Sequence, residues 1–151
     1  MKEYMIIALL ILAGCQAQVD DAKLNLDEVD AMNTMLQDEY KAEAIYAQVL
    51  VDHGDVRHFV NIIRAEQTHS ARIENLFKSR GLDVPAMEEF TAPSFDSVQE
   101  ACAAGVQAEI ANAALYDLEL AKVSDSEVIS VFHALRDASQ NNHLPAFERC
   151  S

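Results

Sequence analysis

A duplicated pattern of carboxylate, tyrosine and histidine residues constrains the fold of this chain most strongly. The first copy consists of Glu39, Tyr46, Glu66 and His69. The second copy repeats its spacing closely, with a glutamine in place of the second glutamate. Its members are Glu109, Tyr116, Gln140 and His143. On an α-helix, residues three or seven positions apart share one face. The pattern therefore predicts two helix pairs that direct carboxylates and imidazoles toward a shared centre.

The composition favours a single helical domain with an acidic surface. The chain has 151 residues, half of them apolar, which is enough for one domain with a core. It contains no tryptophan, four glycines and three prolines, and this composition favours helices over sheets. The formal net charge of −14 argues against nucleic acid as a partner, because phosphate binding needs clusters of lysine and arginine.

The N-terminus carries the features of an export signal. Lys2 precedes a short apolar run that ends in the sequence L-A-G-C at Cys15. The run is too short to span a bilayer and is typical of a signal peptide. Its ending resembles a bacterial lipoprotein signal, whose cysteine becomes the lipidated first residue of the mature protein. We therefore expect a signal peptide over 1–14 and a membrane-anchored lipoprotein, exported to the outer membrane or cell surface. An ordinary secretory signal with a chance cysteine is the alternative.

Helical periodicity divides the rest of the chain into four segments. A polar tether over 15–30 leads into the first helix, with Asp27 or Asp30 as its N-cap, and a bundle follows over 31–151. The expected helices cover about 31–51, 56–79, 97–122 and 126–147.

The longest connection between these helices, 82–96, contains two prolines, and its apolar residues do not recur at a helical spacing. The short connections on either side of it predict two antiparallel helix hairpins. Fully extended, some fifteen residues span up to about 50 Å, more than the roughly 35 Å length of such a helix. The fold we expect is therefore an all-α, ferritin-like four-helix bundle with a long crossover between the second and third helices. A simple up-and-down bundle is the alternative.

Counting along the two hairpins places both copies of the pattern near the middle of the bundle. Buried carboxylates and histidines are costly there unless a metal or a partner neutralises them. The ferritin-like arrangement uses a glutamate from each of two helices and an E-x-x-H pair from each of the others. The predicted ligands are Glu39, Glu66, His69, Glu109 and His143. Oxygen and imidazole donors suit one or two ions of iron, our first choice, or of manganese or zinc.

The two remaining cysteines fall at one level of the second hairpin. Cys102 lies seven residues before Glu109, and Cys150 lies seven after His143. An exported protein meets an oxidising compartment, where disulfides can form. The equal height of the two cysteines in the hairpin therefore predicts a disulfide between them. The alternative is two small buried residues at the end of the bundle.

Residues 31–150 resemble a ferritin-like protein of the rubrerythrin type and, within that superfamily, the uncharacterised domain of unknown function 2202 family. The matching segments are EYKAEAIY at 39–46, AEQTH at 65–69, GVQAE at 105–109 and NHLPAF at 142–147. Rubrerythrin-type proteins carry a di-metal centre and reduce peroxide or oxidise metal, so the resemblance implies a metal-dependent oxidoreductase. It also implies that Tyr46 and Tyr116 hydrogen-bond across to the opposite ligands. A core tyrosine with an ordinary hydroxyl partner is the alternative.

The chain departs from the rubrerythrin pattern in two ways. Gln140 is neutral, so three carboxylates would leave a surplus positive charge on two divalent ions. We expect the second metal position to be weaker, differently filled or empty, with Glu43 or Gln140 as an additional ligand. The sequence also lacks a C-x-x-C pair, so a redox cycle would need an external electron donor.

The sequence as a whole predicts a transition-metal-binding lipoprotein that acts in oxidation or peroxide chemistry. A non-catalytic, metal-buffering lipoprotein and a structural bundle that has lost its metal are the alternatives. Ferritin-like bundles often form homodimers, and no apolar stripe in the sequence decides whether this one does.

Overall fold

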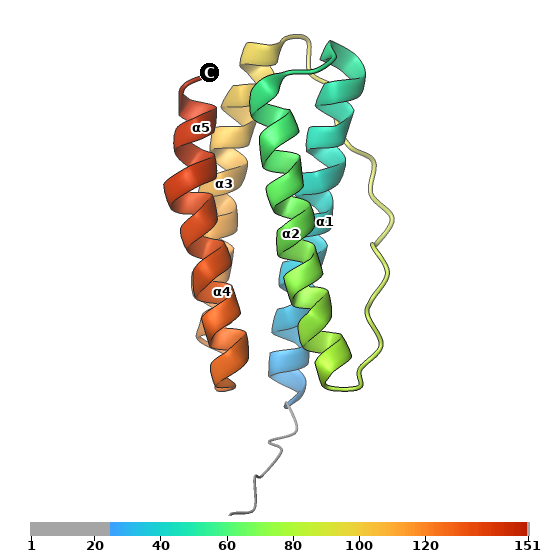
Figure 1. The fold of residues 1–151 in the computed structure, drawn as a ribbon, viewed down its shortest axis with the longest axis vertical. Coiled ribbons are helices and arrows are strands. Elements are labelled where there is room, and N and C mark those ends of the chain that lie inside the picture. Colours follow the sequence, from blue (N-terminus) through green and yellow to red (C-terminus); the bar gives the residue numbers. More distant parts are fainter. Residues whose placement is uncertain (1–24, 151) are drawn as a thin grey trace, which may run out of the picture.

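The computed structural model describes residues 25–150, which form an all-α four-helix bundle (Figure 1). The fourth helix is continuous in the figure and consists of α4, a short π-helical turn η1, and α5. The elements are α1 (Leu26–His53), α2 (Arg57–Ser79), α3 (Val98–Leu120), α4 (Ser126–Ala138), η1 (Ser139–His143) and α5 (Leu144–Glu148). The expected all-α bundle is therefore confirmed. The predicted signal peptide and the lipidation site Cys15 lie outside the described residues.

The first helix begins earlier than the sequence analysis predicted. Asn25, and not Asp27 or Asp30, is its N-cap. The Asn25 side chain accepts a 2.9 Å hydrogen bond from the backbone N–H of Glu28, and the Glu28 carboxylate accepts one of 3.0 Å in return. This reciprocal pair satisfies two N–H groups that lack partners at a helix start. The segment 26–30, expected as part of a tether, is thereby helical.

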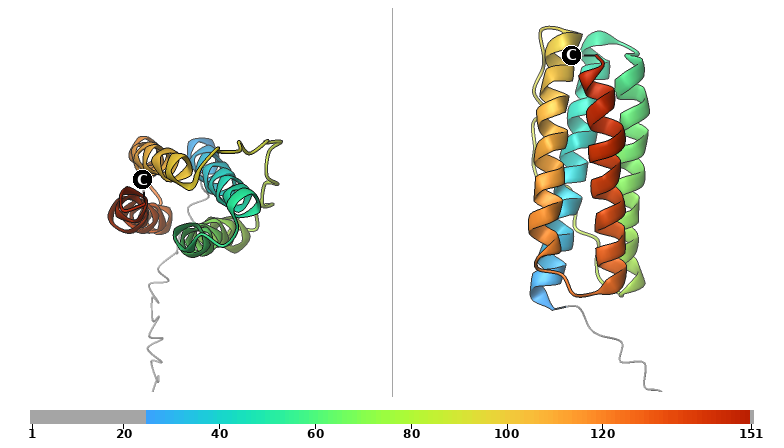
Figure 2. Two further views of the ribbon diagram at one scale, coloured as in Figure 1. Left: turned by 90° about the horizontal axis from the view of Figure 1, so that it is seen from above. Right: turned by 90° about the vertical axis from the view of Figure 1, so that its left-hand side faces the viewer.

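The connection between α2 and α3 runs the length of the bundle along its outside (Figures 1 and 2). Gln37 on α1 holds this connection through its side-chain amide. Its Nε2 donates to the carbonyl of Ala86 at 3.0 Å, and its Oε1 accepts from the N–H of Glu88 at 2.8 Å. Because the connection crosses the bundle, α2 and α3 run in the same direction, and α3 starts the second half of the bundle. The predicted crossover is therefore present.

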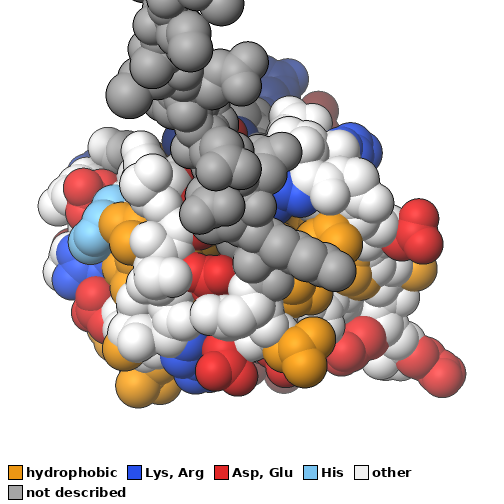
Figure 3. Space-filling view, turned by 90° about the horizontal axis from the view of Figure 1, so that it is seen from below, with side chains coloured by type: hydrophobic (Ala, Val, Ile, Leu, Met, Phe, Trp, Pro, Cys, Tyr) orange, Lys and Arg blue, Asp and Glu red, His pale blue; other side chains and the backbone are white. Residues whose placement is uncertain are grey.

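Salt bridges join the elements at the end of the bundle where α1 begins. Arg80, just after α2, lies 2.8 Å from Asp125 and 3.0 Å from Glu127 at the start of α4. Figure 3 shows this end, where charged side chains of both signs alternate with hydrophobic ones. Among residues 25–150, no helix is long and apolar enough to cross a membrane.

The interior of the bundle contains two hydrophobic clusters, one toward each end. The first includes Met32, Phe77 and Phe132, and the second includes Phe59 and Phe147. In the second cluster, Gly105 on α3 lies flat against the ring of Phe147. A Cβ atom at Gly105 would come within 2.8 Å of that ring, so only glycine allows this approach.

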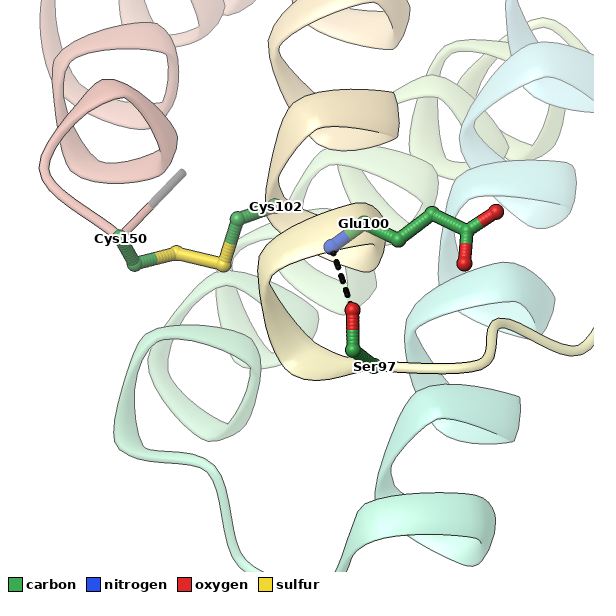
Figure 4. Close-up of a disulfide and its surroundings, with 4 residues drawn as sticks. All are labelled: Ser97, Glu100, Cys102 and Cys150. Atoms are coloured by element: carbon green, nitrogen blue, oxygen red, sulfur yellow. Dashed lines mark hydrogen bonds between the residues drawn. A yellow bond between two sulfur atoms is a disulfide. The ribbon is translucent and has the colours of Figure 1, made fainter.

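A disulfide joins Cys102 on α3 to Cys150 just after α5 (Figure 4). The Cα atoms of the two residues are 5.8 Å apart, within the ordinary range for a disulfide. Figure 4 also shows Ser97, the N-cap of α3, accepting a 3.1 Å hydrogen bond from the backbone N–H of Glu100. The start of the third helix is thereby tied to the end of the chain.

Candidate metal centre

A layer of buried ionisable side chains lies in the interior of the bundle. Each predicted ligand lies in it, with exposed fractions between 0 and 5%. They are Glu39 from α1, Glu66 and His69 from α2, Glu109 from α3 and His143 from η1. The structure therefore brings together five residues that span more than 100 positions of sequence.

Each histidine of this cluster lies between two carboxylates. His69 Nδ1 is 3.2 Å from Glu39 Oε2 and 3.1 Å from Glu66 Oε2. His143 Nδ1 is 3.0 Å from Glu66 Oε1 and 3.4 Å from Glu109 Oε2. Glu66 thus contacts both histidines, one with each of its carboxylate oxygens. The two imidazole rings lie stacked, with centroids 5.2 Å apart and planes inclined by 15°.

The His143 side of the cluster contains an unsatisfied polar atom. Although two carboxylate oxygens lie within 3.4 Å of His143 Nδ1, this atom is buried and makes no hydrogen bond with any described residue. A buried polar atom without a partner is rare in folded proteins and calls for an explanation. Glu66, His69 and His143 each offer a donor atom within 4.8 Å of those of the other two. These donors fit a metal ion, which would use the unsatisfied nitrogen.

The two tyrosines of the duplicated pattern donate hydrogen bonds across the bundle. Tyr46 on α1 donates to Glu109 Oε1 at 2.8 Å, and Tyr116 on α3 donates to Glu39 Oε1 at 2.6 Å. In each case the tyrosine of one half fixes a carboxylate of the other. Burial and the negative charge of these glutamates raise the pKa of both hydroxyls well above the usual value. Both tyrosines therefore stay protonated and act as donors.

The surrounding carboxylates hold protons on both histidines. Burial alone would lower their pKa, but the close contacts with the neighbouring glutamates and the negative charge of these glutamates outweigh it. The pKa rises to about 9 for His69 and to about 10 for His143. In the metal-free protein, two imidazolium ions thus occupy the positions where cations are stabilised. Metal binding at the same nitrogens would release these protons.

The glutamates of the cluster differ in their affinity for protons. Burial, together with the nearby charge of Glu66, raises the pKa of Glu39 to about 7, despite the opposing effect of His69. Burial also acts on Glu66, but the close contacts with His143 and His69 outweigh it and lower the pKa of Glu66. Glu66 is therefore the carboxylate that carries the negative charge at the centre of the cluster.

Gln140 is exposed to solvent and lies outside the cluster. The π-helical turn η1 is the physical reason, because a wider turn contains more residues than an α turn. The N–H of Leu144 bonds to the carbonyl of Ser139, five residues earlier, which is the hydrogen bond of a π-helix. The next residue, Pro145, has no N–H and so cannot form the α-helical hydrogen bond to the carbonyl four residues before it. Ser139 and His143, four residues apart, both face inward, whereas the wider turn rotates Gln140, three residues before His143, outward.

The side of the cluster where a fourth carboxylate was sought contains the neutral side chains of Ser139 and Asn112, with the carboxylate of Asp38 behind them. Ser139 Oγ donates to Asn112 Oδ1 at 2.8 Å. Asn112 Nδ2 donates in turn to Asp38 at 2.8 Å and approaches Glu39 at 3.4 Å. The sequence analysis missed these three residues. Asn112 follows Glu109 by three positions and so shares its helix face, a signal that was available. Ser139 precedes His143 by four positions, which share a face in an α-helix, so a signal for it was available as well.

Glu43, the other additional ligand considered, is half-buried on α1 and faces α2. Its Oε1 accepts a 2.6 Å hydrogen bond from the hydroxyl of Ser70. Burial is the main cause of the raised pKa of Glu43, with the charges of Glu66 and Glu39 adding to it. In this arrangement Glu43 flanks the cluster and contacts neither histidine by hydrogen bond or ion pair.

Comparison with known proteins places the chain in a family and gives a structural relative. No curated protein matches the sequence. The crystal structure of a hypothetical protein from Methanococcus jannaschii DSM 2661 is similar, with a TM-score of 0.74 and 22% sequence identity. The similarity covers 83% of this chain and 80% of that one. At 22% identity it shows that the two proteins share a fold, and nothing more. The family model described as an uncharacterized protein domain (DUF2202) matches residues 28–150, so this chain belongs to that family, as its sequence motifs indicated.

Proposed function

We propose that this protein binds two divalent transition-metal ions, one beside each histidine, with Glu66 as the shared ligand. The observation that carries the proposal is the position of the two Nδ1 atoms. Each lies within 3.4 Å of two carboxylate oxygens, and one of the two always belongs to Glu66. A donor set of one imidazole and two carboxylates is typical of iron, manganese and zinc sites.

The charges in the cluster predict that the two ions bind with unequal affinity. Three buried carboxylates more than balance the first divalent ion but fall one charge short of balancing two. Ser139 and Asn112 are neutral, so they add no negative charge to the cluster. The first ion should therefore bind tightly and the second more weakly. Iron is our first candidate, because it combines oxygen and imidazole ligands with redox chemistry.

Metal analysis of protein purified without chelators tests this proposal directly. We expect two ions per chain at saturation, and two binding steps when the metal-free protein is titrated with Fe²⁺, Mn²⁺ or Zn²⁺ in a calorimeter. Binding should release protons, because both histidines are protonated in the metal-free state. Repeating the titration in buffers of different ionisation enthalpy measures that release.

The same experiments separate the proposal from its alternatives. Two irons that react with peroxide or dioxygen would favour an oxidoreductase that depends on an external electron donor. Two ions that exchange freely and do not react would favour a metal buffer. A chain that takes up none of the three metals would refute the proposal and leave a structural bundle with an ionic core.

A further inference from the structure

A small pocket between α1 and α3 connects the cluster to the surface. Its volume is about 120 Å³, and its lining includes Glu66 and Glu109 at the inner end. Ala111, another lining residue, is exposed, so the pocket opens between the two helices. A space of this size holds several water molecules or one small organic molecule.

The pocket reaches both carboxylates of one proposed metal position but only one carboxylate of the other, and neither histidine lines it. Glu66 and Glu109, which flank His143 Nδ1, both line it. Glu39 and His69, which define the other position with Glu66, are not part of its lining. An ion beside His143 is therefore open to an external ligand, whereas an ion beside His69 is enclosed by protein. Metal sites with an open position are the ones that bind further ligands.

The wall of the pocket is mostly apolar, and apart from Glu66 and Glu109 at the inner end it has two charged lining residues of opposite sign. Ala42 and Ile45 from α1 face Ala108 from α3 across the space. Asp38 and Lys41 also line it, and their opposite charges offset each other. The net charge of the cluster itself therefore decides which ligands are attracted. Two divalent ions held by three carboxylates carry one surplus positive charge, which an external anion would neutralise.

We propose that the pocket binds a short aliphatic monocarboxylate, of the size of acetate, as an external ligand of the ion beside His143. The carboxylate supplies the charge that the protein lacks, and its alkyl group packs against Ala42 and Ala108. This inference rests on the proposed function, because without two ions the inner end of the pocket holds only negative carboxylates. It adds that the two positions are unequal in access as well as in affinity.

Cobalt-substituted protein tests the inference without an activity assay. The metal-free protein is loaded with two Co²⁺ per chain and titrated with sodium acetate at constant ionic strength, while the visible absorption is followed. We expect a saturable change from one acetate per chain. Ala108→Leu fills the pocket and should weaken acetate binding at least tenfold without lowering the cobalt content. Ala114→Leu, at an exposed position of the same helix, is the matched control and should bind acetate like the unaltered protein.

Each other outcome has a defined meaning. Two bound cobalt ions with no response to acetate would overturn the inference while leaving the proposed function intact. The same holds if Ala108→Leu binds acetate as tightly as the Ala114→Leu control. A capacity of one cobalt ion would also overturn it, since the surplus positive charge would then be absent. Failure to take up any cobalt would count against the proposed function itself.

Discussion

The hydroxyl of Tyr116 donates a 2.6 Å hydrogen bond to the carboxylate of Glu39, which is completely buried. Tyr46 and Glu109 repeat this relationship in the other half of the bundle. A buried carboxylate that loses such a donor still bears the free-energy cost of desolvation but has no hydrogen bond to offset it. The two tyrosines therefore stabilise the ionic layer of the metal-free protein and fix the positions of its carboxylates.

Removing either hydroxyl should destabilise the fold. We expect Tyr116→Phe or Tyr46→Phe to lower the free energy of unfolding of the metal-free protein by about 1–3 kcal/mol. Urea denaturation at pH 7 measures this change. Tyr40→Phe is the control, because the Tyr40 hydroxyl bonds to the partly exposed Glu74 and should matter less. An equal loss from all three variants would show that the buried carboxylates have no special role.

Substitution of the shared ligand should affect both metal positions together. Glu66→Gln keeps the shape of the side chain but removes a charge that contacts His69 and His143. We expect the metal-free variant to lose about 3–5 kcal/mol of stability, because two buried imidazolium ions lose a common partner. Metal capacity should fall below two ions per chain, as measured by elemental analysis. Glu89→Gln, at an exposed position of the crossover, should change neither quantity.

Restoring a glutamate at position 140 should not restore the fourth carboxylate. Because Gln140 faces solvent, Gln140→Glu is expected to leave the affinity for both ions unchanged. Ser139→Asp instead places a carboxylate beside Asn112 on the inner face and should strengthen the weaker binding step by about tenfold. Calorimetric titration of both variants compares the two positions. A gain from Gln140→Glu alone would mean that η1 rearranges when metal binds.

Acid should weaken the junction between α1 and the turn before α4. Burial raises the pKa of Glu28, but hydrogen bonds from the Ser124 hydroxyl and from several backbone N–H groups outweigh it and lower this pKa to about 2. Between pH 4.5 and 2 the unfolded chain takes up a proton at Glu28 that the folded chain does not. The stability that Glu28 contributes is therefore complete above pH 4.5 and is lost as the pH falls toward 2.

Comparison with a Glu28→Gln variant measures this contribution. The variant should unfold about 1–3 kcal/mol more easily than the unaltered protein at pH 6, with the difference shrinking toward pH 2. Urea denaturation across this pH range gives both values. A difference that does not change with pH would assign the effect to packing, and not to the charge of Glu28.

The disulfide should contribute strongly to stability. Cys102 and Cys150 are 48 residues apart, and closing a loop of that length in the unfolded chain is worth roughly 4 kcal/mol. Replacing both cysteines with alanine should lower the melting temperature, and a reducing agent should lower that of the unaltered protein alone. If the reductant lowers both equally, the disulfide is not the cause.

The spacing of the helices and the positions of the buried glutamates could be predicted from sequence because both depend on α-helical periodicity. Glu39, Glu66 and Glu109 each lie within a regular helix, so counting along the hairpins placed them at one level. The start of α1 was predicted too late, because the reciprocal Asn25–Glu28 pair was overlooked in favour of nearby aspartates.

The second half of the site was harder to predict because its backbone leaves that periodicity. A π turn changes which side chains face inward, and nothing in the sequence other than Pro145 hinted at one. Gln140 was therefore placed in the site, although it is exposed. Ser139 is buried four positions before His143, and it was left out although that spacing places it on the same helix face. The pocket between α1 and α3 depends on how closely two helices approach, which periodicity does not determine.

The position of Glu66 explains how the duplicated halves could diverge without losing their centre. A group that lies near the symmetry axis of a duplicated structure meets both halves, so a single copy is enough. Glu66 already reaches His69 and His143 with its two oxygens. Its equivalent in the second half, Gln140, faces solvent and contacts neither histidine, so the helix around it has room to adopt a different geometry. One residue of the first half thus keeps the two histidines in equivalent surroundings.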